Sequence, residues 1–409
     1  MIQLGKNLLG VAGAAVLLSA CIITSGGGDD DGSGGGGATV PDGGSGGVGG
    51  TGGGTGGTGG ITDPPCNNAG DIDGDGDGWT GDAGDCNDCQ ALINPGAYDY
   101  VGNAIDEDCN GGVDDTVMSC DADLNLDSND ALDGARAIEL CTMAEGESWG
   151  VVSASYNHVD GTPATSPDFD LGHGILGGFG DVVVPQGGNK LLAISSGAAR
   201  NPTDPGWVSP DGFSKGYTTG AAPGFPKESP ACPDVVTGEA NDSIHLRVRI
   251  RTPTNAKSFR FNVNMYTFEY PGFICSQFND FVTAIMSPAP AEHADADCDG
   301  TPCGNISFDA MGNPLSVNAG FLTVCEPGEF GGKMFDCPDG IDALAGTGYE
   351  GHAATGWLQT KAPVENPGEE IVLEFGAWDS GDGILDTTGL IDNLEWDLEE
   401  TVVITDPQI

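Results

Sequence analysis

An acidic stretch near the start of the chain has the residue types and the spacing of a metal loop; it reads DIDGDGDGWTGDAGDCNDC. Asp73, Asp75 and Asp77 alternate with glycines, and Gly78 stands at the sixth position. Calcium loops place carboxylates at alternate positions because a turning backbone points every second side chain inward, and a glycine permits the sharp bend. The main-chain carbonyl of Trp79 follows at the seventh position. The spacing therefore predicts a calcium site.

The closing ligand of this loop differs from that of an EF-hand. Gly84 occupies the twelfth position, where an EF-hand carries a glutamate. No pair of helices therefore needs to flank the loop. An unfolded acidic spacer is the alternative interpretation, but such a spacer does not require cysteines beside its carboxylates. The carboxylates expected to complete the site are Asp85 and Asp88, with Asp82 as a spare.

A second, weaker copy of the pattern occurs in NAIDEDCNGGVDD. Asp106, Asp108 and Asn110 repeat the alternate spacing, and Gly111 again takes the sixth place. Two such loops, each with a cysteine beside its carboxylates, favour a metal-binding module over a spacer. The residues expected to close the second loop are Asp114 or Asp115.

The composition agrees with a cation as partner. The chain has 62 acidic and 13 basic residues, which gives a formal net charge of −49. Nucleic acid is excluded as a partner because a polyanion would be repelled and no basic stripe exists to contact phosphates. Hard multivalent cations neutralise clustered carboxylates.

The cysteines and the N-terminus indicate an exported protein. Thirteen cysteines favour an oxidising compartment. After Lys6, the run LLGVAGAAVLL is too short to span a bilayer. The sequence LSAC that follows resembles a bacterial lipobox, which implies that residues 1–21 are a signal peptide and that Cys21 is the lipidated residue. Removal of Cys21 leaves twelve cysteines, an even number suited to disulfides.

Two further segments precede or connect the folded parts. Residues 22–65 are nearly all glycine with serine, threonine and aspartate, which predicts a disordered tether with a root-mean-square reach of roughly 35 Å. Residues 118–141 predict a helical connector, because SND is a helix start and Leu132, Ala135 and Ile138 have helical spacing.

Short β patterns separated by turn residues fill residues 142–409. In SIHLRVRIRTP, Leu246, Val248 and Ile250 alternate with three arginines, as in a strand with one buried and one solvated face. No βαβ rhythm occurs. We therefore expect a mainly β fold, an antiparallel, jelly-roll-like β-sandwich, preceded by the small loop-rich module at 66–117 and the tether.

The cysteines of the later segments suggest local pairs. Cysteines that are near in sequence or that flank the helix are expected to join first, and one distant pair then remains by elimination. The resulting expectations are Cys298–Cys303, Cys325–Cys337, Cys120–Cys141 and Cys232–Cys275.

The run DGDGDGWTGDAGDCNDCQALINPGAYDYVGNAIDEDCNGGVDD resembles the short metal-binding repeat of bacterial surface proteins, which is similar in style to thrombospondin type 3 calcium repeats. This resemblance implies a Cys86–Cys109 disulfide. Cys66 and Cys89 are additions to the pattern; a second bridge, Cys66–Cys89, is expected, but other pairings among the four cysteines stay open. Calcium is the expected metal; copper or zinc is the lesser alternative, since histidines and thiolates are not concentrated here.

A second resemblance covers roughly residues 150–400. The segments TPTNAKSFRFNVNMYTFEYPGFICSQFNDFVTAIM, GNISFDAMGNPLSVNAGF, GTGYEGHAATGWLQTKAPV and WDSGDGILDTTGLIDNLEW are similar to the choice-of-anchor L domain of bacterial surface proteins. That resemblance implies a cell-envelope location, with the lipid on Cys21 as the anchor. It implies no activity.

Candidate sites in this later region are weaker. Glu350 and His352 in YEGHAATGW are a conceivable acid and base, although a structural histidine is the more common case. No H-E-x-x-H motif occurs. The segment WDSGDGILDTTGLIDN offers a second candidate metal site, with a solvated acidic loop as the alternative: Asp379, Asp382, Asp386 and Asp392.

The sequence thus predicts a non-enzymatic cell-envelope lipoprotein, in the outer membrane and surface-exposed or facing the periplasm. Its β-sandwich would bind an extracellular ligand, a glycan or a surface protein. The alternatives are a secreted polysaccharide hydrolase that uses carboxylates such as Glu350 and Asp382, and a structural coat component.

Overall fold

A computed structural model describes residues 70–115, 119–318 and 320–408. All of these belong to one compact unit, Thr62–Ile409. The expectations for residues 1–65, including Cys21, fall outside the described residues. Within the described part, strands dominate, and α1 (Ala131–Arg136) is the single α-helix. The prediction of a mainly β fold is confirmed.

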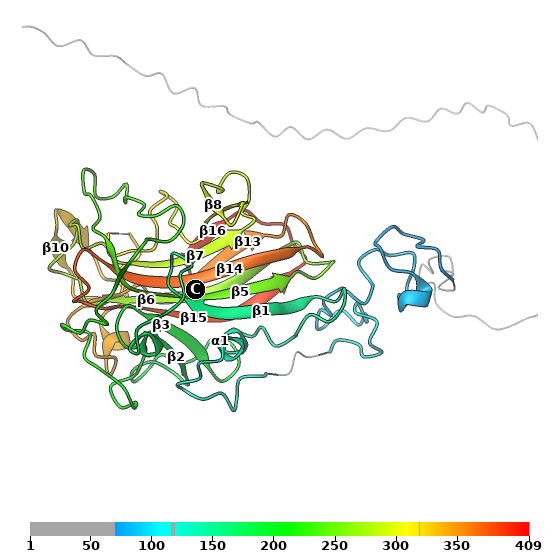
Figure 1. Cartoon of the computed structure of the whole chain (residues 1–409), viewed down its shortest axis with the longest axis horizontal. Helices are drawn as coiled ribbons and strands as arrows, with labels where there is room; N and C mark the ends of the chain where they lie inside the picture. Colours follow the sequence, from blue (N-terminus) through cyan, green and yellow to red (C-terminus); the bar gives the residue numbers. More distant parts are fainter. Residues whose placement is uncertain (1–69, 116–118, 319, 409) are drawn as a thin grey trace, which may run out of the picture. The chain divides into compact units, whose positions relative to one another are not determined.

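Two antiparallel sheets of seven strands build the sandwich (Figure 1). The first sheet has its strands in the order β1-β5-β14-β7-β9-β8, with β4 paired to β5. Its strands are β1 (Gly150–Asn157), β4 (Thr218–Thr219), β5 (Ala240–Arg251), β7 (Phe281–Ser287), β8 (Ala296–Cys298), β9 (Thr301–Asn305) and β14 (Glu370–Ser380).

The second sheet has the order β16-β13-β6-β15-β3-β2, with β12 paired to β6. A separate hairpin pairs β10 with β11. The strands are β2 (His173–Leu176), β3 (Leu191–Ser195), β6 (Ser258–Thr267), β10 (Gly328–Phe330), β11 (Lys333–Phe335), β12 (Ala353–Ala354), β13 (Leu358–Pro363), β15 (Thr387–Asp397) and β16 (Ile404–Pro407).

The alternation along β5 has the predicted consequence. Leu246, Val248 and Ile250 are fully buried in the core. The arginines between them lie on the outer face, where Arg247 pairs with Glu374 of β14 at 2.9 Å. Between the sheets, aromatic rings meet edge to face, as Phe261 of β6 does with Phe375 of β14 at 5.1 Å.

Helix α1 lies in the connector where the sequence predicts it. Asp130 caps its N-terminus by accepting a hydrogen bond from the Leu132 main-chain nitrogen. Ala135 and Ile138 are fully buried, although Ile138 follows the end of the helix. The helix and the residues directly after it therefore pack against the hydrophobic core of the sandwich.

The strands at the two ends of each strand order are short or partly covered. On β1, Val151 hydrogen-bonds with Thr142 and Ala144 of the preceding segment. On β2, the Ile175 main-chain nitrogen donates to the carbonyl of Leu126. The other two edges are β8, a three-residue strand, and β16, which ends in Pro407.

Candidate metal centre and sandwich pocket

The first acidic loop is shaped by its own aspartates rather than by regular structure. Asp73 accepts hydrogen bonds from the main-chain nitrogens of Gly76 (2.6 Å) and Gly78 (3.0 Å). Asp77 accepts from the Trp79 nitrogen at 2.8 Å. Gly76 and Gly78 have φ values of 86° and 95°, a conformation that glycine adopts without strain. The alternating glycines therefore allow the loop to turn around its carboxylates.

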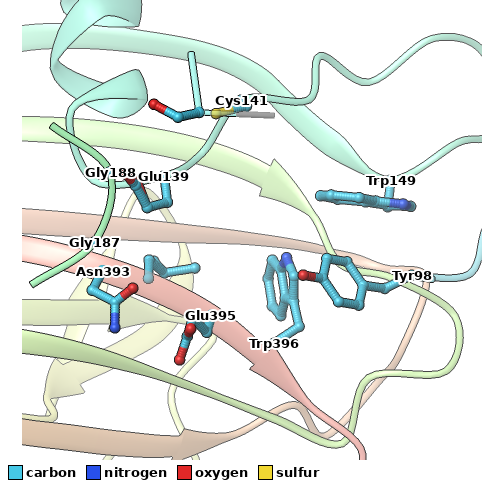
Figure 2. A pocket seen from close by; sticks show the side chains of 11 residues that line it. Tyr98, Glu139, Cys141, Trp149, Gly187, Gly188, Asn393, Glu395 and Trp396 are labelled. Carbon is cyan, nitrogen blue, oxygen red and sulfur yellow. The ribbon is translucent and has the colours of Figure 1, made fainter. Parts of the chain in front are cut away.

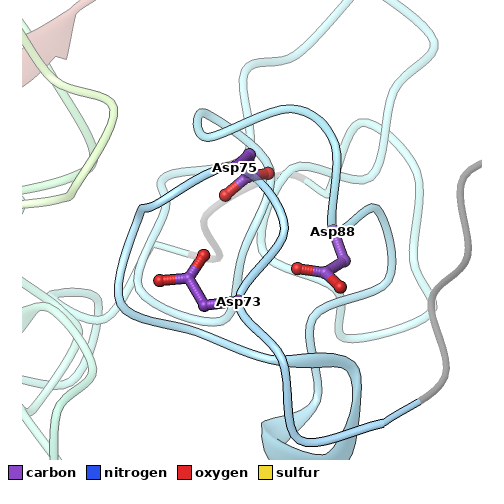
Figure 3. Close-up of side chains that lie close together, drawn as sticks. All are labelled: Asp73, Asp75 and Asp88. Atoms are coloured by element: carbon purple, nitrogen blue, oxygen red, sulfur yellow. The ribbon is translucent and has the colours of Figure 1, made fainter.

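Five carboxylates converge in this loop. Asp73, Asp75 and Asp88 each offer an oxygen within 4.8 Å of the others, and so do Asp75, Asp77 and Asp85. Figure 3 shows the carboxylates of Asp73, Asp75 and Asp88 facing a common point. Asp75 belongs to both groups, and it therefore lies at the centre of the candidate metal site.

The donor set fits a hard cation. The Oδ2 atoms of Asp75 and Asp85 are buried and have no hydrogen-bond partner among the described residues. Burial raises the pKa of both Asp77 and Asp85, and the charge of Asp75 raises each further. A bound cation would offset both effects, since a nearby positive charge favours the ionised carboxylate. Oxygen-only ligands suit Ca²⁺ or Mg²⁺ better than Cu²⁺ or Zn²⁺.

Two of the predicted ligands of the first loop are placed differently. Asp82 is exposed within the 3-10 turn η1 (Gly81–Ala83) and belongs to neither close group. Trp79 contacts Asp77 through its main-chain nitrogen, and no described contact bears on its carbonyl as a ligand. Their roles as ligands stay predictions.

The carboxylates of the second loop bond to their own loop. Asp106 accepts from the Gly111 nitrogen at 3.1 Å, and Asp108 accepts from the nitrogen of Asn110 at 3.1 Å. Asn110 also donates from its side chain to Asp108 and to Asp115. Both close groups of metal-binding side chains in the described part of the chain lie in the first loop. A second ion at this loop therefore stays a prediction.

Asp114 closes the second loop through hydrogen bonds. Its Oδ1 accepts from three successive main-chain nitrogens, those of Gly102, Asn103 and Ala104, at 2.7 to 2.9 Å. The bond from Ala104 contributes most to lowering the pKa of Asp114. The described hydrogen bonds of this carboxylate are thus all accepted from main-chain nitrogens.

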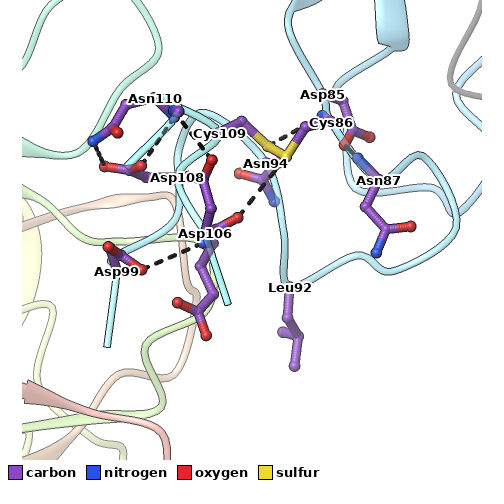
Figure 4. Close-up of a disulfide and its surroundings, with 12 residues drawn as sticks. Asp85, Cys86, Asn87, Leu92, Asn94, Asp99, Asp106, Asp108, Cys109 and Asn110 are labelled. Carbon is purple, nitrogen blue, oxygen red and sulfur yellow. Dashed lines mark hydrogen bonds between the residues drawn. A yellow bond between two sulfur atoms is a disulfide. The ribbon is translucent and has the colours of Figure 1, made fainter. Parts of the chain in front are cut away.

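A disulfide joins the two loops. Cys86 and Cys109 are bonded, with their Cα atoms 5.5 Å apart (Figure 4). The other four pairs present are those expected from the sequence, whereas Cys66 lies outside the described residues, so Cys66–Cys89 stays a prediction. The four pairs are Cys120–Cys141, Cys232–Cys275, Cys298–Cys303 and Cys325–Cys337.

Sequence reasoning missed three buried polar residues of the module. Asn94, fully buried, bonds to Asp77. Asp99 accepts from the Asp115 nitrogen at 2.6 Å and from the Glu107 nitrogen at 3.4 Å. Glu107 accepts a hydrogen bond from the main-chain nitrogen of Tyr100 at 3.2 Å. None of the three follows the alternate spacing of the loops. The only signal for them in the sequence is that they lie close to the two loops along the chain.

The second candidate metal site of the sequence is divided by the structure. Asp379 and Asp386 are both buried, and burial, then the charge of Asp379, raise the pKa of Asp386. Asp382, between them, is exposed. Asp392 lies six residues along β15 from Asp386, about 20 Å on an extended strand, and accepts from the Gln186 nitrogen at 2.5 Å. The four aspartates therefore do not form one site.

Asp392 accepts a hydrogen bond from the Gly187 nitrogen, and Gly187 lines a pocket of about 200 Å³ (Figure 2). Glu139 faces this pocket, and both of its carboxylate oxygens are buried without a hydrogen-bond partner among the described residues. Burial, then the charges of Asp121 and Asp392, raise the pKa of Glu139 to about 8. The other side chains combine aromatic rings with polar groups: Tyr98, Trp149, Trp396, Ser119, Asn393 and Glu395.

The proposed acid and base of the sequence are held apart by other partners. Glu350 accepts from the Gly346 nitrogen at 2.7 Å. The Nδ1 atom of His352 is 2.7 Å from the Tyr270 carbonyl, and its ring stacks on Phe268. Burial lowers the pKa of His352. These contacts give His352 a structural position.

Comparison with known proteins supports a metal-binding module. Residues 85–115 match the model of a family labelled Cu-binding_MopE and described as "Putative metal-binding motif". This range contains Asp85, Asp88 and the whole second loop. No curated protein matches the chain in sequence.

Among solved structures, the chain has a distant likeness to the crystal structure of the K2 cleaved adhesin domain of Lys-gingipain. The identity is 12%, the TM-score is 0.26, and the match covers 60% of this chain and 89% of that one. A score of this size establishes no common fold, so the fold rests on the sheets described above. Among the described residues, no helix has the length and apolarity needed to cross a membrane.

Proposed function

We propose that this chain is a cell-envelope protein in which a calcium-stabilised module presents a β-sandwich that binds material outside the cell. The observation that carries this proposal is the convergence of five aspartates in two groups that share Asp75. The partnerless oxygens of Asp75 and Asp85 support a cation as the missing partner.

Calcium is the metal that we propose. Both close groups contain aspartate alone, and Ca²⁺ takes six to eight oxygen ligands in flexible geometry. Copper and zinc prefer sites that include imidazole or thiolate. The copper in the matched family's label makes Cu²⁺ the competitor to test. Calorimetry of the full chain should give a calcium isotherm at the module and a weaker response to Cu²⁺.

An extracellular or surface location is supported by the five disulfides among the described residues. For the anchor, we propose a lipid on Cys21 in the outer membrane, followed by the glycine-rich tether, with the folded part surface-exposed or facing the periplasm. Cys21→Ala should move the protein from the membrane fraction to a soluble pool. Retention of the variant in membranes after a carbonate wash would contradict the anchor.

Binding at the pocket of Glu139 is the proposed role of the sandwich. Three aromatic rings, from Tyr98, Trp149 and Trp396, line this pocket together with carboxylates and an amide. Tyrosine and tryptophan offer apolar contact area with a polar edge, which suits sugar rings and exposed side chains of a partner protein. A glycan or a surface protein is therefore the proposed ligand.

The test is a glycan array probed with the full chain, with and without calcium. Saturable binding that Trp149→Ala weakens at least tenfold, about 1.4 kcal/mol, is expected. Trp207→Ala, a change of the same size outside the pocket lining, serves as the control. Turnover of a polysaccharide, lost in a Glu350→Gln, His352→Ala variant, would instead favour the hydrolase. Absence of any ligand would favour a structural coat component.

A further inference from the structure

Five carboxylates lie buried at one end of the sandwich, far along the chain from the metal-binding module. We call them the inner acidic cluster, and each side chain belongs to a residue that is at most 3% exposed. The members are Asp242, Glu269, Asp280, Asp379 and Asp386.

The topology brings these residues together. Asp242 is near the start of β5, and Asp379 is near the end of its antiparallel neighbour β14. Asp280 precedes β7 directly, Asp386 precedes β15 directly, and Glu269 follows β6. Because all these strands are antiparallel, the starts of β5, β7 and β15 and the ends of β14 and β6 share one end of the sandwich.

Two members of the inner acidic cluster have hydrogen-bond partners for both oxygens. Asp280 accepts from the Ser380 nitrogen of one sheet and from the Thr387 hydroxyl of the other, each at 2.8 Å. Asp242 accepts from the Lys215 nitrogen at 2.8 Å and from the Tyr217 nitrogen at 3.1 Å. These two carboxylates therefore serve as structural ties.

Asp379 and Asp386 differ from those two. All four of their carboxylate oxygens are buried and make no hydrogen bond with the described residues, and the same holds for Oε2 of Glu269. An ionised carboxylate that is buried without a partner is costly, so such groups are normally paired or bound to metal. These orphaned oxygens are an observation separate from the clustering itself.

The nearest basic group does not supply the partner. Lys215 is buried, but its Nζ donates to the main-chain carbonyl of Ser195 at 2.9 Å. Within the described ranges, no ion pair joins Lys215 to Asp379 or Asp386. One ammonium also could not balance five carboxylates.

The chemistry of the donors selects the cation. Burial and the charge of Asp280 raise the pKa of Asp379, and the nearby hydroxyl of Ser196 opposes this rise. The cluster thus offers carboxylate and hydroxyl oxygens, and it contains no thiolate and no imidazole. Oxygen donors of this kind suit Ca²⁺, which tolerates irregular geometry, better than Zn²⁺ or Cu²⁺. Burial and the charge of Asp379 raise the pKa of Asp386 well above its ordinary range, so bound protons are the competing way to neutralise the pair.

We propose that Asp379 and Asp386 bind a calcium ion between the two sheets, with the hydroxyl of Ser196 as a further oxygen donor. This ion would join β14 of one sheet to the start of β15 in the other. The site excludes Asp382 and Asp392, and it is independent of the module and of the function proposed above.

The test counts calcium ions per chain by mass spectrometry in full-length Asp75→Asn protein, which lacks the shared ligand of the module. Adding Asp379→Asn and Asp386→Asn should lower the number of bound ions by one, whereas adding the exposed Asp382→Asn should leave that number unchanged. The drop in the number of bound ions from wild type to Asp75→Asn tests the calcium site of the module. The further drop on adding Asp379→Asn and Asp386→Asn tests the site between the sheets. Either site can therefore be refuted without the other.

Calcium-free Asp75→Asn protein would overturn the proposal, and so would a triple variant that binds as many ions as the Asp75→Asn protein. If the triple variant does not fold, terbium replaces calcium in the Asp75→Asn protein, with Trp378 beside Asp379 as the sensitiser. Sensitised emission that calcium displaces, and that Trp378→Phe reduces severalfold, is expected. Absence of emission would show that protons neutralise the pair.

Discussion

Asn94 donates a hydrogen bond from Nδ2 to Oδ2 of Asp77 at 2.8 Å. Its Oδ1 accepts from the hydroxyl of Thr254, also at 2.8 Å. Thr254 lies in the loop between β5 and β6, the central strands of the sandwich. One buried amide therefore links a candidate metal ligand of the module to the sandwich. Asn255 adds a second link by bonding to both main-chain polar groups of Tyr98.

Asn94→Ala should weaken the effect of calcium on the sandwich. Losing the amide leaves buried partners unsatisfied, at a cost of about 1–3 kcal/mol. Calorimetric unfolding with and without calcium should show a lower melting temperature and a smaller calcium-induced rise. Asn87→Ala, in the same module, is the control, because Asn87 contacts Asp85 through its main chain. A full calcium-induced rise in Asn94→Ala would contradict the link.

Asp75→Asn should abolish calcium binding at the module. Asp75 belongs to both close groups, so its loss affects every converging carboxylate. Affinity at this site should fall at least 100-fold, about 2.8 kcal/mol, when measured by calorimetry. Asp82→Asn removes the same charge from an exposed position and should leave the affinity unchanged. Equal losses in the two variants would mean that net charge, rather than coordination, drives binding.

Removal of the Cys86–Cys109 disulfide should also weaken calcium binding. The bond spans 23 residues and holds the two acidic loops together, and closing a loop of this order restricts the unfolded chain by about 3 kcal/mol. A Cys86→Ser, Cys109→Ser variant should bind calcium more weakly and melt at a lower temperature. The pair Cys298→Ser, Cys303→Ser, which spans only five residues in the sandwich, should leave calcium affinity intact. Unchanged affinity in the first variant would refute this role.

Glu139 should make the stability of the sandwich fall as pH rises. Its pKa is raised from 4.5 to about 8 in the fold, so between these values the native state holds a proton that the unfolded state has lost. Stability from this group is complete below pH 4.5 and is lost as pH rises through about 8. Asp392, whose pKa is raised to about 7, acts in the same direction.

Glu139→Gln isolates that contribution. The difference in unfolding free energy between variant and wild type should grow in favour of the variant from pH 5 to pH 8.5, as measured by urea unfolding. Glu147→Gln, at an exposed position nearby in sequence, should give a constant difference. Parallel curves for Glu139→Gln and wild type would contradict the proton assignment.

The sequence predicts much of the fold because its signals are local. Alternation places Leu246, Val248 and Ile250 in the core, and a helix start signal places α1 after Asp130. The same local reasoning groups Asp73, Asp75 and Asp77, whose spacing is two residues. It also finds the disulfide between Cys298 and Cys303.

Contacts between distant segments escape such reasoning. Asp386 and Asp392 are close in sequence, yet an extended strand separates them. Conversely, Asp280 and Asp379 belong to neighbouring strands and are brought together by register, which spacing cannot reveal. Asn94 is found only through its buried contacts. Prediction of the site from the sequence is therefore limited by strand pairing, because the pairing of each strand depends on the whole sheet.

The covered and shortened edge strands have a consequence for the behaviour of the protein in concentrated solution. An open edge is a template on which another chain can add a strand, and repeated addition leads to fibrils. Here Val151 of β1 and Ile175 of β2 already bond to neighbouring segments of the same chain, β8 has only three residues, and β16 ends in Pro407. These features shorten the free edge that the described sheets offer, and so they lower the tendency of the sheets to add a strand from another chain.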